Sequence, residues 1–173
     1  MSEASVTHEA LCLAIRMEIE GREFYLEAVK HCGNEPGKKL FRSLARDEAV
    51  HRRDFEKIYE SLRDKYDWPE TKVVTRKTRR KLSYLAGLTP QTCPALPPAE
   101  DELEVVNTAI KMENESYDFY RKQLALAVYP GEKEFYEALS AAENIHRLAL
   151  LDYLEFLSDP AAYFVNKEHP TLD

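Results

Sequence analysis

The chain has 173 residues, of which 44% are hydrophobic and 32% are charged. This length and composition favour one domain with a real core, and they exclude disordered, collagen-like and disulfide-scaffold proteins. The formal net charge of -7 argues against a dedicated nucleic-acid-binding surface, which would have to neutralise phosphates. No stretch reaches the roughly 18 apolar residues that cross a bilayer. We therefore expect a cytoplasmic protein with no membrane segment.

Four Pro-free stretches of the chain are typical of helices. Ala, Leu, Glu, Lys and Arg dominate them, and apolar residues recur at three-to-four spacing. The pattern predicts helices over about residues 7–32, 37–66, 100–128 and 131–158, with Thr7 as the cap of the first.

Residues 67–99 have a different character and contain five of the nine prolines. They form a connection much longer than the ~2–8 residues that join neighbouring antiparallel helices. The second and third helices are therefore expected to be joined by a crossover, which predicts an all-α, ferritin-like four-helix bundle spanning residues 1–173 as one domain. Leu82, Leu85 and Leu88 indicate a short extra helix inside the crossover.

The chain contains an internal repeat. AIRMEIEGREFY at 14–25 matches AIKMENESYDFY at 109–120, an offset of 95 residues, and Glu48 and His51 recur at the same offset as Glu143 and His146. The bundle is therefore expected to consist of two helical hairpins related by approximate two-fold symmetry.

In each of the four predicted helices the apolar residues at three-to-four spacing form a stripe along one face. Glutamates and histidines interrupt these stripes at their centres. One glutamate lies in each of the first and third stripes, and a Glu-x-x-His pair lies in each of the second and fourth. Residues three apart share a helical face, so all six side chains can reach the bundle axis. They are Glu18, Glu48, His51, Glu113, Glu143 and His146.

Such a cluster in a low-dielectric core requires compensation, because each unpaired buried ion costs several kcal/mol. Two divalent cations would balance four carboxylates while both imidazoles stay neutral. Mixed carboxylate and imidazole ligands suit iron or manganese, and the lack of thiolate ligands argues against a structural zinc site. The arrangement is the general di-iron carboxylate pattern of helical bundles.

The sequence resembles the rubrerythrin-like branch of the ferritin-like superfamily. The matching motifs are Met17-Glu18 with Tyr25, Glu48-x-x-His51, Met112-Glu113 with Tyr120, and Glu143-x-x-His146. The resemblance implies two iron ions, although manganese or zinc could be the metal loaded.

The resemblance also implies a role for each site residue. Glu48 and Glu143 would bridge the two metals, while Glu18 with His51 and Glu113 with His146 would each complete one of them. Tyr25 and Tyr120 would donate hydrogen bonds to ligating carboxylates.

Two features depart from the family pattern. Cys12, Cys32 and Cys93 form no C-x-x-C pair, so the rubredoxin-like module of classical rubrerythrins is not expected, and electrons would come from an external donor such as a rubredoxin-like protein. Ser116 stands where many relatives carry a seventh, glutamate ligand.

The leading hypothesis is a homodimeric di-iron oxidoreductase that reduces hydrogen peroxide or dioxygen, as a peroxidase or a ferroxidase does. A non-catalytic iron-binding or storage protein is one alternative. Another is an interaction module that uses the basic run at 72–81.

Two other polar residues near the predicted site are assigned no function. We expect Asp47 to be solvated rather than to orient an imidazole, and Cys32 to pack as a small hydrophobic residue.

Overall fold

The computed structural model describes residues 3–65 and 101–168. Within these ranges the chain forms five helices, α1 (Glu3–His31), α2 (Glu35–Lys65), α3 (Glu102–Leu126), α4 (Pro130–Ser158) and α5 (Pro160–Glu168). None of these helices is long and apolar enough to cross a membrane. The predicted crossover at 67–99, its short helix and the basic run at 72–81 lie outside the described residues.

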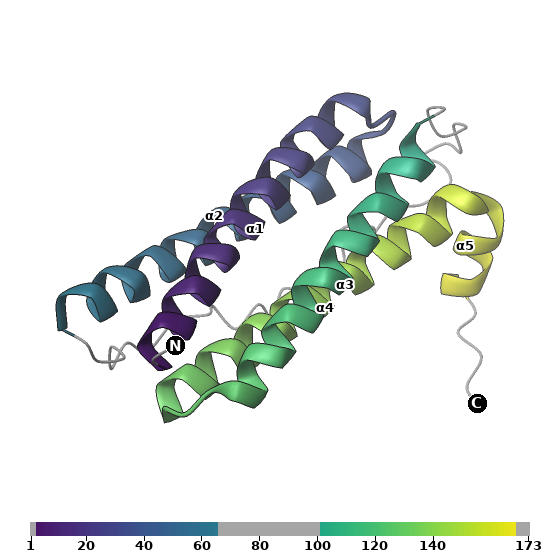
Figure 1. Ribbon diagram of the computed structural model, residues 1–173. Helices are drawn as coiled ribbons and strands as arrows, with labels where there is room; N and C mark the ends of the chain where they lie inside the picture. Colours follow the sequence, from purple (N-terminus) through teal and green to yellow (C-terminus); the bar gives the residue numbers. More distant parts are fainter. Residues whose placement is uncertain (1–2, 66–100, 169–173) are drawn as a thin grey trace.

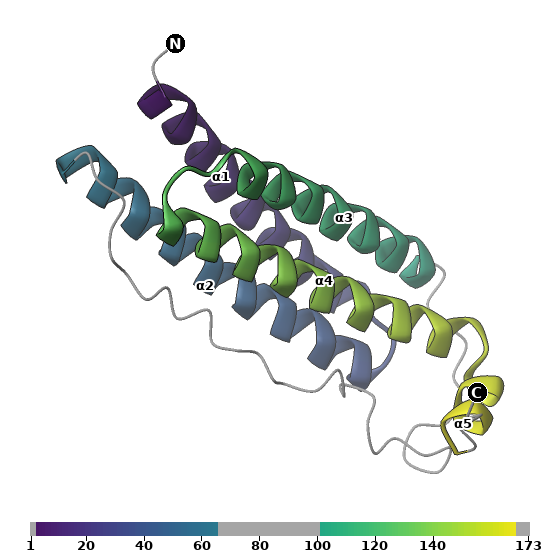
Figure 2. The same cartoon turned by 90° about the horizontal axis from the view of Figure 1, so that it is seen from below.

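The helices form two hairpins that pack side by side. α1 pairs with α2 and α3 pairs with α4 (Figure 1). Seen from below, α1 faces α3 and α2 faces α4 (Figure 2). α2 and α3 run in the same direction, so α2 ends and α3 begins at opposite ends of the bundle (Figure 1). The predicted ferritin-like bundle is therefore confirmed.

Two helices begin earlier than the sequence predicts. α2 begins at Glu35 because Asn34 caps it, its side-chain oxygen accepting a hydrogen bond of 2.9 Å from the backbone N–H of Gly37. Pro36 fits in the first turn, where its missing N–H would have no helical partner. α1 begins at Glu3, so Thr7 lies inside the helix, and its prediction as a cap was wrong.

The fifth helix was not predicted. Asp159 caps it by accepting a hydrogen bond of 2.9 Å from the backbone N–H of Ala162, and Pro160 is its first residue. Tyr163 and Phe164 are 3% and 8% exposed and belong to the core of the bundle. The Asp-Pro pair was therefore a start signal for α5 as well as the end of α4.

The apolar core falls into two clusters. The first, the Tyr153 cluster, lies toward α5 and includes Tyr25, Phe41, Leu44, Val106, Leu150, Tyr153, Phe156 and Tyr163. The second, the Phe55 cluster, lies toward the α3–α4 turn and includes Leu11, Phe55, Ile58, Tyr120, Phe135, Tyr136 and Leu139. The predicted site residues lie along the helices between these two clusters.

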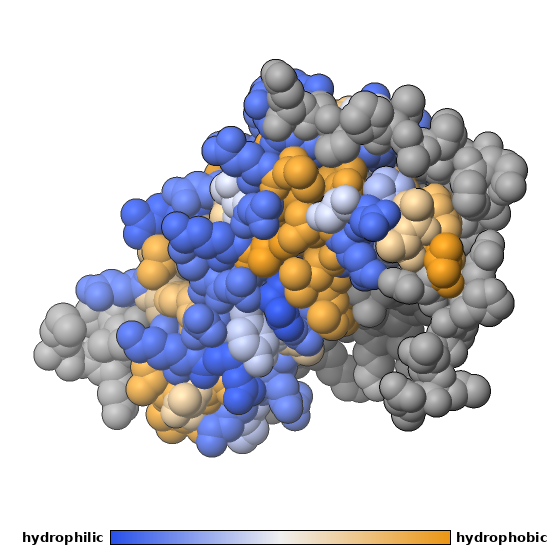
Figure 3. Space-filling model, turned by 90° about the vertical axis from the view of Figure 1, so that its right-hand side faces the viewer, coloured by the Kyte–Doolittle hydropathy of each residue, from blue (hydrophilic) through white to orange (hydrophobic). Residues whose placement is uncertain are grey.

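Some large apolar side chains remain on the surface. Leu126, Val128 and Tyr129, at the α3–α4 turn, are between 51% and 68% exposed. On the face that Figure 3 presents, hydrophobic surface gathers in a central area bordered by hydrophilic side chains, and more of it lies at the lower left. Exposed apolar surface of this kind is typical of proteins that associate with partners.

Candidate metal centre

The structure brings together all six residues that the sequence singled out. Each of the four long helices contributes one glutamate, and α2 and α4 each add a histidine from the next turn. All six side chains are buried, with exposed fractions between 2% and 8%. They are Glu18, Glu48, His51, Glu113, Glu143 and His146.

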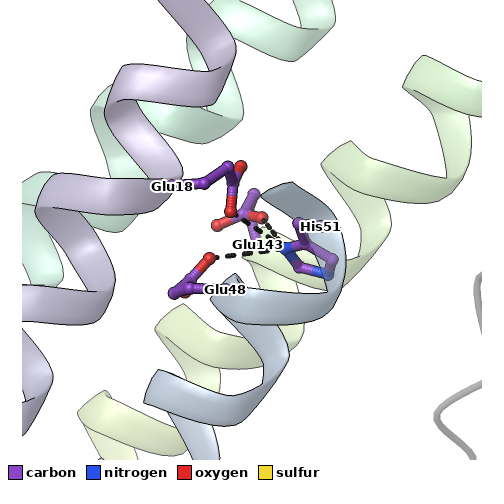
Figure 4. Close-up of side chains that lie close together, drawn as sticks. All are labelled: Glu18, Glu48, His51 and Glu143. Carbon is purple, nitrogen blue, oxygen red and sulfur yellow. Dashed lines mark ion pairs between the residues drawn. The ribbon is translucent and has the colours of Figure 1, made fainter. Parts of the chain in front are cut away.

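The six residues form two overlapping groups. Glu18, Glu48, His51 and Glu143 offer ligand atoms that all lie within 4.8 Å of one another. A second group with the same spacing contains Glu113 and His146 together with the same Glu48 and Glu143. Figure 4 shows the first group, in which side chains from α1, α2 and α4 point toward one another. Two carboxylates are thus placed where two cations could share them.

Both imidazoles present the same nitrogen to the centre. His51 Nδ1 lies 3.3 Å from Glu18 Oε2, 3.4 Å from Glu48 Oε2 and 3.3 Å from Glu143 Oε1 (Figure 4). The two histidine rings stack with their centroids 5.7 Å apart. Each group therefore has one imidazole nitrogen facing three carboxylates.

The second group repeats this geometry around His146. Its Nδ1 lies 3.3 Å from Glu48 Oε1, 3.6 Å from Glu113 Oε2 and 3.8 Å from Glu143 Oε2. Glu48 and Glu143 belong to both groups, and in each carboxylate one oxygen faces His51 and the other faces His146.

Several inward-facing atoms of the site lack a hydrogen-bond partner. They include Glu18 Oε2, Glu113 Oε2, Glu143 Oε1, His51 Nδ1 and His146 Nδ1. Buried polar atoms of native proteins are nearly always satisfied, so a group of buried ligand atoms that face one point without partners fits a cation-binding site. The chemistry of this donor set fits iron or manganese.

The electrostatics of the carboxylates lead to the same conclusion. Burial, followed by repulsion from Glu48, raises the pKa of Glu18 to about 8. Burial and the nearby Glu113 and Glu48 raise the pKa of Glu143 well above its ordinary value. Burial also opposes the charge on Glu48, but the close approach of the His146 and His51 imidazoles outweighs it and holds the Glu48 pKa well below its ordinary range. Without metal, protons must compensate part of this negative charge.

Both histidines respond to these carboxylates. Burial lowers the pKa of each imidazole, but the carboxylates outweigh it and raise both values well above the ordinary one. The charge of Glu18 makes the largest single opposing contribution at His51, and the charge of Glu113 does so at His146. A bound cation would take over the role of these protons, because metal binding displaces them from its ligands.

Two tyrosines connect the hairpins at the site. Tyr25 on α1 donates a hydrogen bond to Glu113 on α3, and Tyr120 on α3 donates one to Glu18 on α1. Both tyrosines are at most 1% exposed. Burial and the neighbouring carboxylates raise both tyrosine pKa values well above the ordinary one, so the hydroxyls remain donors. The tyrosines therefore leave the second oxygen of each carboxylate to face the centre.

A further carboxylate faces His146. Asp47 Oδ2 lies 3.5 Å from His146 Nε2, the nitrogen that points away from the centre. The expectation that Asp47 is simply solvated was wrong, since its side chain is only 28% exposed and it approaches the histidine of the other hairpin. Sequence spacing could not reveal this contact, because it joins α2 to α4. Carboxylates in this position fix the orientation of ligating imidazoles.

A small cavity adjoins the centre between α1 and α3. Besides ligands and Tyr25, its lining includes Met17, Gly21, Met112 and Ser116, which are two pairs related by the repeat. A Cβ on Gly21 would lie 3.7 Å from Glu48 Cγ, so the glycine widens the cavity beside a shared ligand. Ser116 leaves room where a longer side chain would fill the space.

A second buried polar cluster lies at the end of the bundle near α5. Glu102, which is 1% exposed, accepts hydrogen bonds from the Tyr153 hydroxyl at 2.5 Å, Cys32 Sγ at 2.8 Å and the Asn34 amide at 3.2 Å. Cys32 packs in the hydrophobic core as expected, and in addition its thiol donates to this carboxylate. Sequence reasoning missed Glu102 because an acidic residue in the first turn of a helix is ordinary.

Comparison with known proteins agrees with the geometry. The family model described as Rubrerythrin matches residues 9–154, which include all six site residues. A solved structure of a hypothetical protein from Pyrococcus furiosus is similar in fold, with a TM-score of 0.65 and 23% sequence identity over 87% of this chain and 89% of that chain. Among curated proteins, none matches.

Proposed function

The chain belongs to the rubrerythrin family, and from that premise we propose that it is a di-iron oxidoreductase. In this proposal it reduces hydrogen peroxide or dioxygen by two electrons and is recharged by an external donor. The observation that carries it is the position of Glu48 and Glu143, each of which belongs to both ligand groups. Two bound iron(II) ions would supply the two electrons.

The protein residues have separable roles in this proposal. Glu18 and His51 complete one ligand group, and Glu113 and His146 complete the other. Glu48 and Glu143 hold both metals, and their two oxygens already face opposite histidines. Tyr25 and Tyr120 orient the unshared carboxylates. The same donor set would also hold manganese or zinc, so the metal loaded is a matter for measurement.

The size and lining of the cavity between α1 and α3 favour a small, neutral oxidant as the substrate. Met17 and Met112 give it an apolar lining, and Ser116 contributes a hydroxyl. The adjacent carboxylates would repel anions, whereas hydrogen peroxide or dioxygen would meet no such barrier. The limited space likewise favours an oxidant of few atoms over a large organic substrate.

We also propose a homodimer and an external electron donor, such as a rubredoxin-like protein. The resemblance to rubrerythrins supports both, and the exposed apolar residues Leu126, Val128 and Tyr129 supply surface for association. Light scattering would measure the oligomeric state. A large closed shell of subunits, rather than a dimer, would favour an iron-storage role.

The test begins with metal analysis of protein purified without added metal. The protein is then loaded with iron(II) without oxygen and titrated with hydrogen peroxide or with dioxygen. We expect one peroxide to oxidise both irons of a chain, and a reductant to restore the iron(II) state for repeated turnover. Iron that is retained but never turns over would replace the enzyme proposal with the binding or storage alternative.

Two variants test how the metals share ligands. Glu143→Gln removes the negative charge that both groups share and one of the two oxygens, so it should reduce occupancy of both metals, whereas Glu18→Gln should mainly affect one. Glu132→Gln is the matched control, because Glu132 is a buried glutamate of α4 outside the site. Equal metal content in Glu143→Gln and Glu132→Gln protein would contradict the shared role.

A further inference from the structure

We propose that Tyr25, Tyr153 and Tyr163 form an electron-transfer path, the tyrosine relay, that connects the metal centre with α5. Only its inner end rests on the proposed function. The relay supplies a route by which single electrons reach the buried site from the end of the bundle. No other part of the proposed mechanism uses Tyr153 or Tyr163.

The rings of the relay form a continuous series with two phenylalanines between them. Tyr25 stacks on Phe41 with centroids 6.1 Å apart, and Phe41 meets Tyr153 at 6.1 Å. Tyr153 stacks on Phe156 at 6.1 Å, and Phe156 meets Tyr163 at 5.6 Å. Electron transfer through a protein weakens steeply with distance, so closely spaced rings shorten each step. The phenylalanines are harder to oxidise than the tyrosines and serve only as the intervening medium.

Each tyrosine of the relay donates its hydroxyl proton toward a carboxylate. Tyr25 donates to Glu113, Tyr153 donates to Glu102 at 2.5 Å, and Tyr163 donates to Asp152 at 3.2 and 3.3 Å. An oxidised phenol is strongly acidic and must release its proton, so a hydrogen-bonded base makes tyrosine oxidation feasible. The relay therefore has a proton acceptor at every tyrosine.

The inner terminus of the relay lies at the metal site itself. Glu113, the acceptor for Tyr25, is one of the six site residues, and its other oxygen faces the centre. The outer terminus lies on α5, where Val165, two residues after Tyr163, is 59% exposed. The path thus runs from the site to a helix at the surface.

The electrons and protons balance at each step. Hydrogen peroxide at a centre that supplies only one of the two electrons needed to form water would take the second electron from Tyr25, whose proton moves to Glu113, leaving a neutral tyrosyl radical. Tyr153 then reduces Tyr25 and Tyr163 reduces Tyr153, and each tyrosine that is reduced regains its proton from its carboxylate. A one-electron reductant outside the protein finally reduces Tyr163. One passage through the relay therefore supplies the second electron of one peroxide reduction.

The relay is not a by-product of the repeat. The repeat places Tyr120 opposite Tyr25 and Tyr136 opposite Phe41, but it places Ile58 opposite Tyr153. An isoleucine side chain does not carry electrons as a tyrosine does, so the described part of the first hairpin has no equivalent step at this register. α5, which carries Tyr163, follows the second hairpin; the positions that correspond to it in the repeat are 65–73, and all of these but Lys65 lie outside the described residues.

The first experiment measures electron transfer without any peroxide. A ruthenium polypyridyl label is attached at Val165→Cys in a Cys12→Ser, Cys93→Ser chain loaded with iron(II) in the absence of oxygen. Light and an irreversible electron acceptor oxidise the label, and absorbance follows its recovery as iron(III) forms. We expect Tyr153→Phe to slow iron oxidation by an order of magnitude or more. Tyr136→Phe, a buried tyrosine of the same helix at the other end of the bundle, should leave the rate unchanged.

The second experiment tests the relay in metal-free protein, so its outcome is independent of the proposed function. The same label is oxidised by light, the sample is frozen, and the tyrosyl radical is examined by electron paramagnetic resonance. Each tyrosine gives its own hyperfine pattern, because the pattern depends on the side-chain dihedral angle. We expect a component in the parent protein that disappears in Tyr153→Phe and persists in Tyr136→Phe.

A variant that keeps every ring tests the proton step. Glu102→Gln removes the acceptor of the Tyr153 proton, so transfer should slow and its solvent deuterium isotope effect should change. Equal rates and identical radical spectra in the parent, Tyr153→Phe and Glu102→Gln proteins would overturn the relay. A Tyr153-dependent radical in metal-free protein, together with no iron binding, would retain the relay and refute the proposed function.

Discussion

The hydroxyl of Tyr120 on α3 donates a hydrogen bond to the Glu18 carboxylate on α1. Tyr25 on α1 likewise donates a hydrogen bond to the Glu113 carboxylate on α3, so each hairpin donates one hydrogen bond to the other. Each hairpin therefore orients an unshared carboxylate of the other. Packing of α1 against α3 and the geometry of the metal site depend on each other through these two contacts.

Tyr120→Phe should weaken metal binding but not abolish it. The ring and its packing remain, but Glu18 loses the donor that fixes its orientation, and changes of this kind cost about 10–100-fold in affinity. Competition with a chromogenic chelator would measure the change. Tyr117→Phe, a partly buried tyrosine of the same helix, is the control. Unchanged affinity in Tyr120→Phe would show that the hydrogen bond does not position the ligand.

Stability of the metal-free protein should fall as the pH rises from about 5 to about 8. The Glu18 pKa is raised from an ordinary 4.5 to about 8 in the folded state. The stability that protonated Glu18 gives the folded protein is therefore fully present below pH 4.5 and is lost as the pH rises to about 8. Glu143, His51 and His146, whose folded pKa values are also raised, act in the same direction. Glu48, with its lowered pKa, acts oppositely, and its contribution is lost as the pH falls below its ordinary range.

Metal should reverse this trend, because cations replace the protons that the cluster loses. The increase in Tm on adding iron(II) or manganese(II) should therefore be larger at pH 8 than at pH 6. Thermal unfolding with chelator and with metal, at several pH values, would measure both effects. Without metal, the Tm of the Glu18→Gln protein should depend less on pH than the Tm of the parent protein. A metal-free stability that rises across this range would contradict the assignment.

Asp47→Asn should increase the difference in metal affinity between the two ligand groups. Asp47 approaches His146 Nε2, whereas its repeat counterpart is Ala142, so the substitution should weaken mainly the metal held by His146 and Glu113. Calorimetric titration with manganese(II) should then resolve two binding steps further apart than in the parent. Asp54→Asn, on the same helix, serves as the control. Equal weakening of both steps would count against selective orientation of His146.

Gly37→Ala should destabilise the bundle, whereas Gly21→Ala should not. A Cβ on Gly37 would overlap Tyr153 and the Cys32 sulfur, and overpacking of this kind costs about 1–3 kcal/mol. A Cβ on Gly21 would meet Glu48 Cγ at 3.7 Å, an ordinary contact, and alanine gains about 1 kcal/mol in helix propensity. Urea unfolding of both metal-free variants gives the comparison. Equal stabilities would mean that the α5 end of the bundle can relax around Gly37.

The apolar stripes and the repeat made the site predictable from the sequence. Helical spacing places Glu48 and His51 on one face, and the offset of 95 residues places Glu143 and His146 at the matching register. Helical periodicity is a local property, so it also predicted the four long helices. Boundaries were less certain, because Asn34 and Asp159 act as caps through backbone contacts that depend on the exact turn.

What the sequence by itself determined is therefore the four long helices, their buried faces and the six residues that meet on the bundle axis, because periodicity and repetition are written in local order along the chain. Only the tertiary structure decided which tyrosine reaches which glutamate, that Asp47 faces His146, and that Glu102 gathers Cys32 and Tyr153 beneath α5. These contacts join residues between 51 and 102 positions apart. Apart from the contact between Tyr153 and Glu102, which joins α4 to α3, they depend on how one hairpin is placed against the other, and no local pattern encodes that placement.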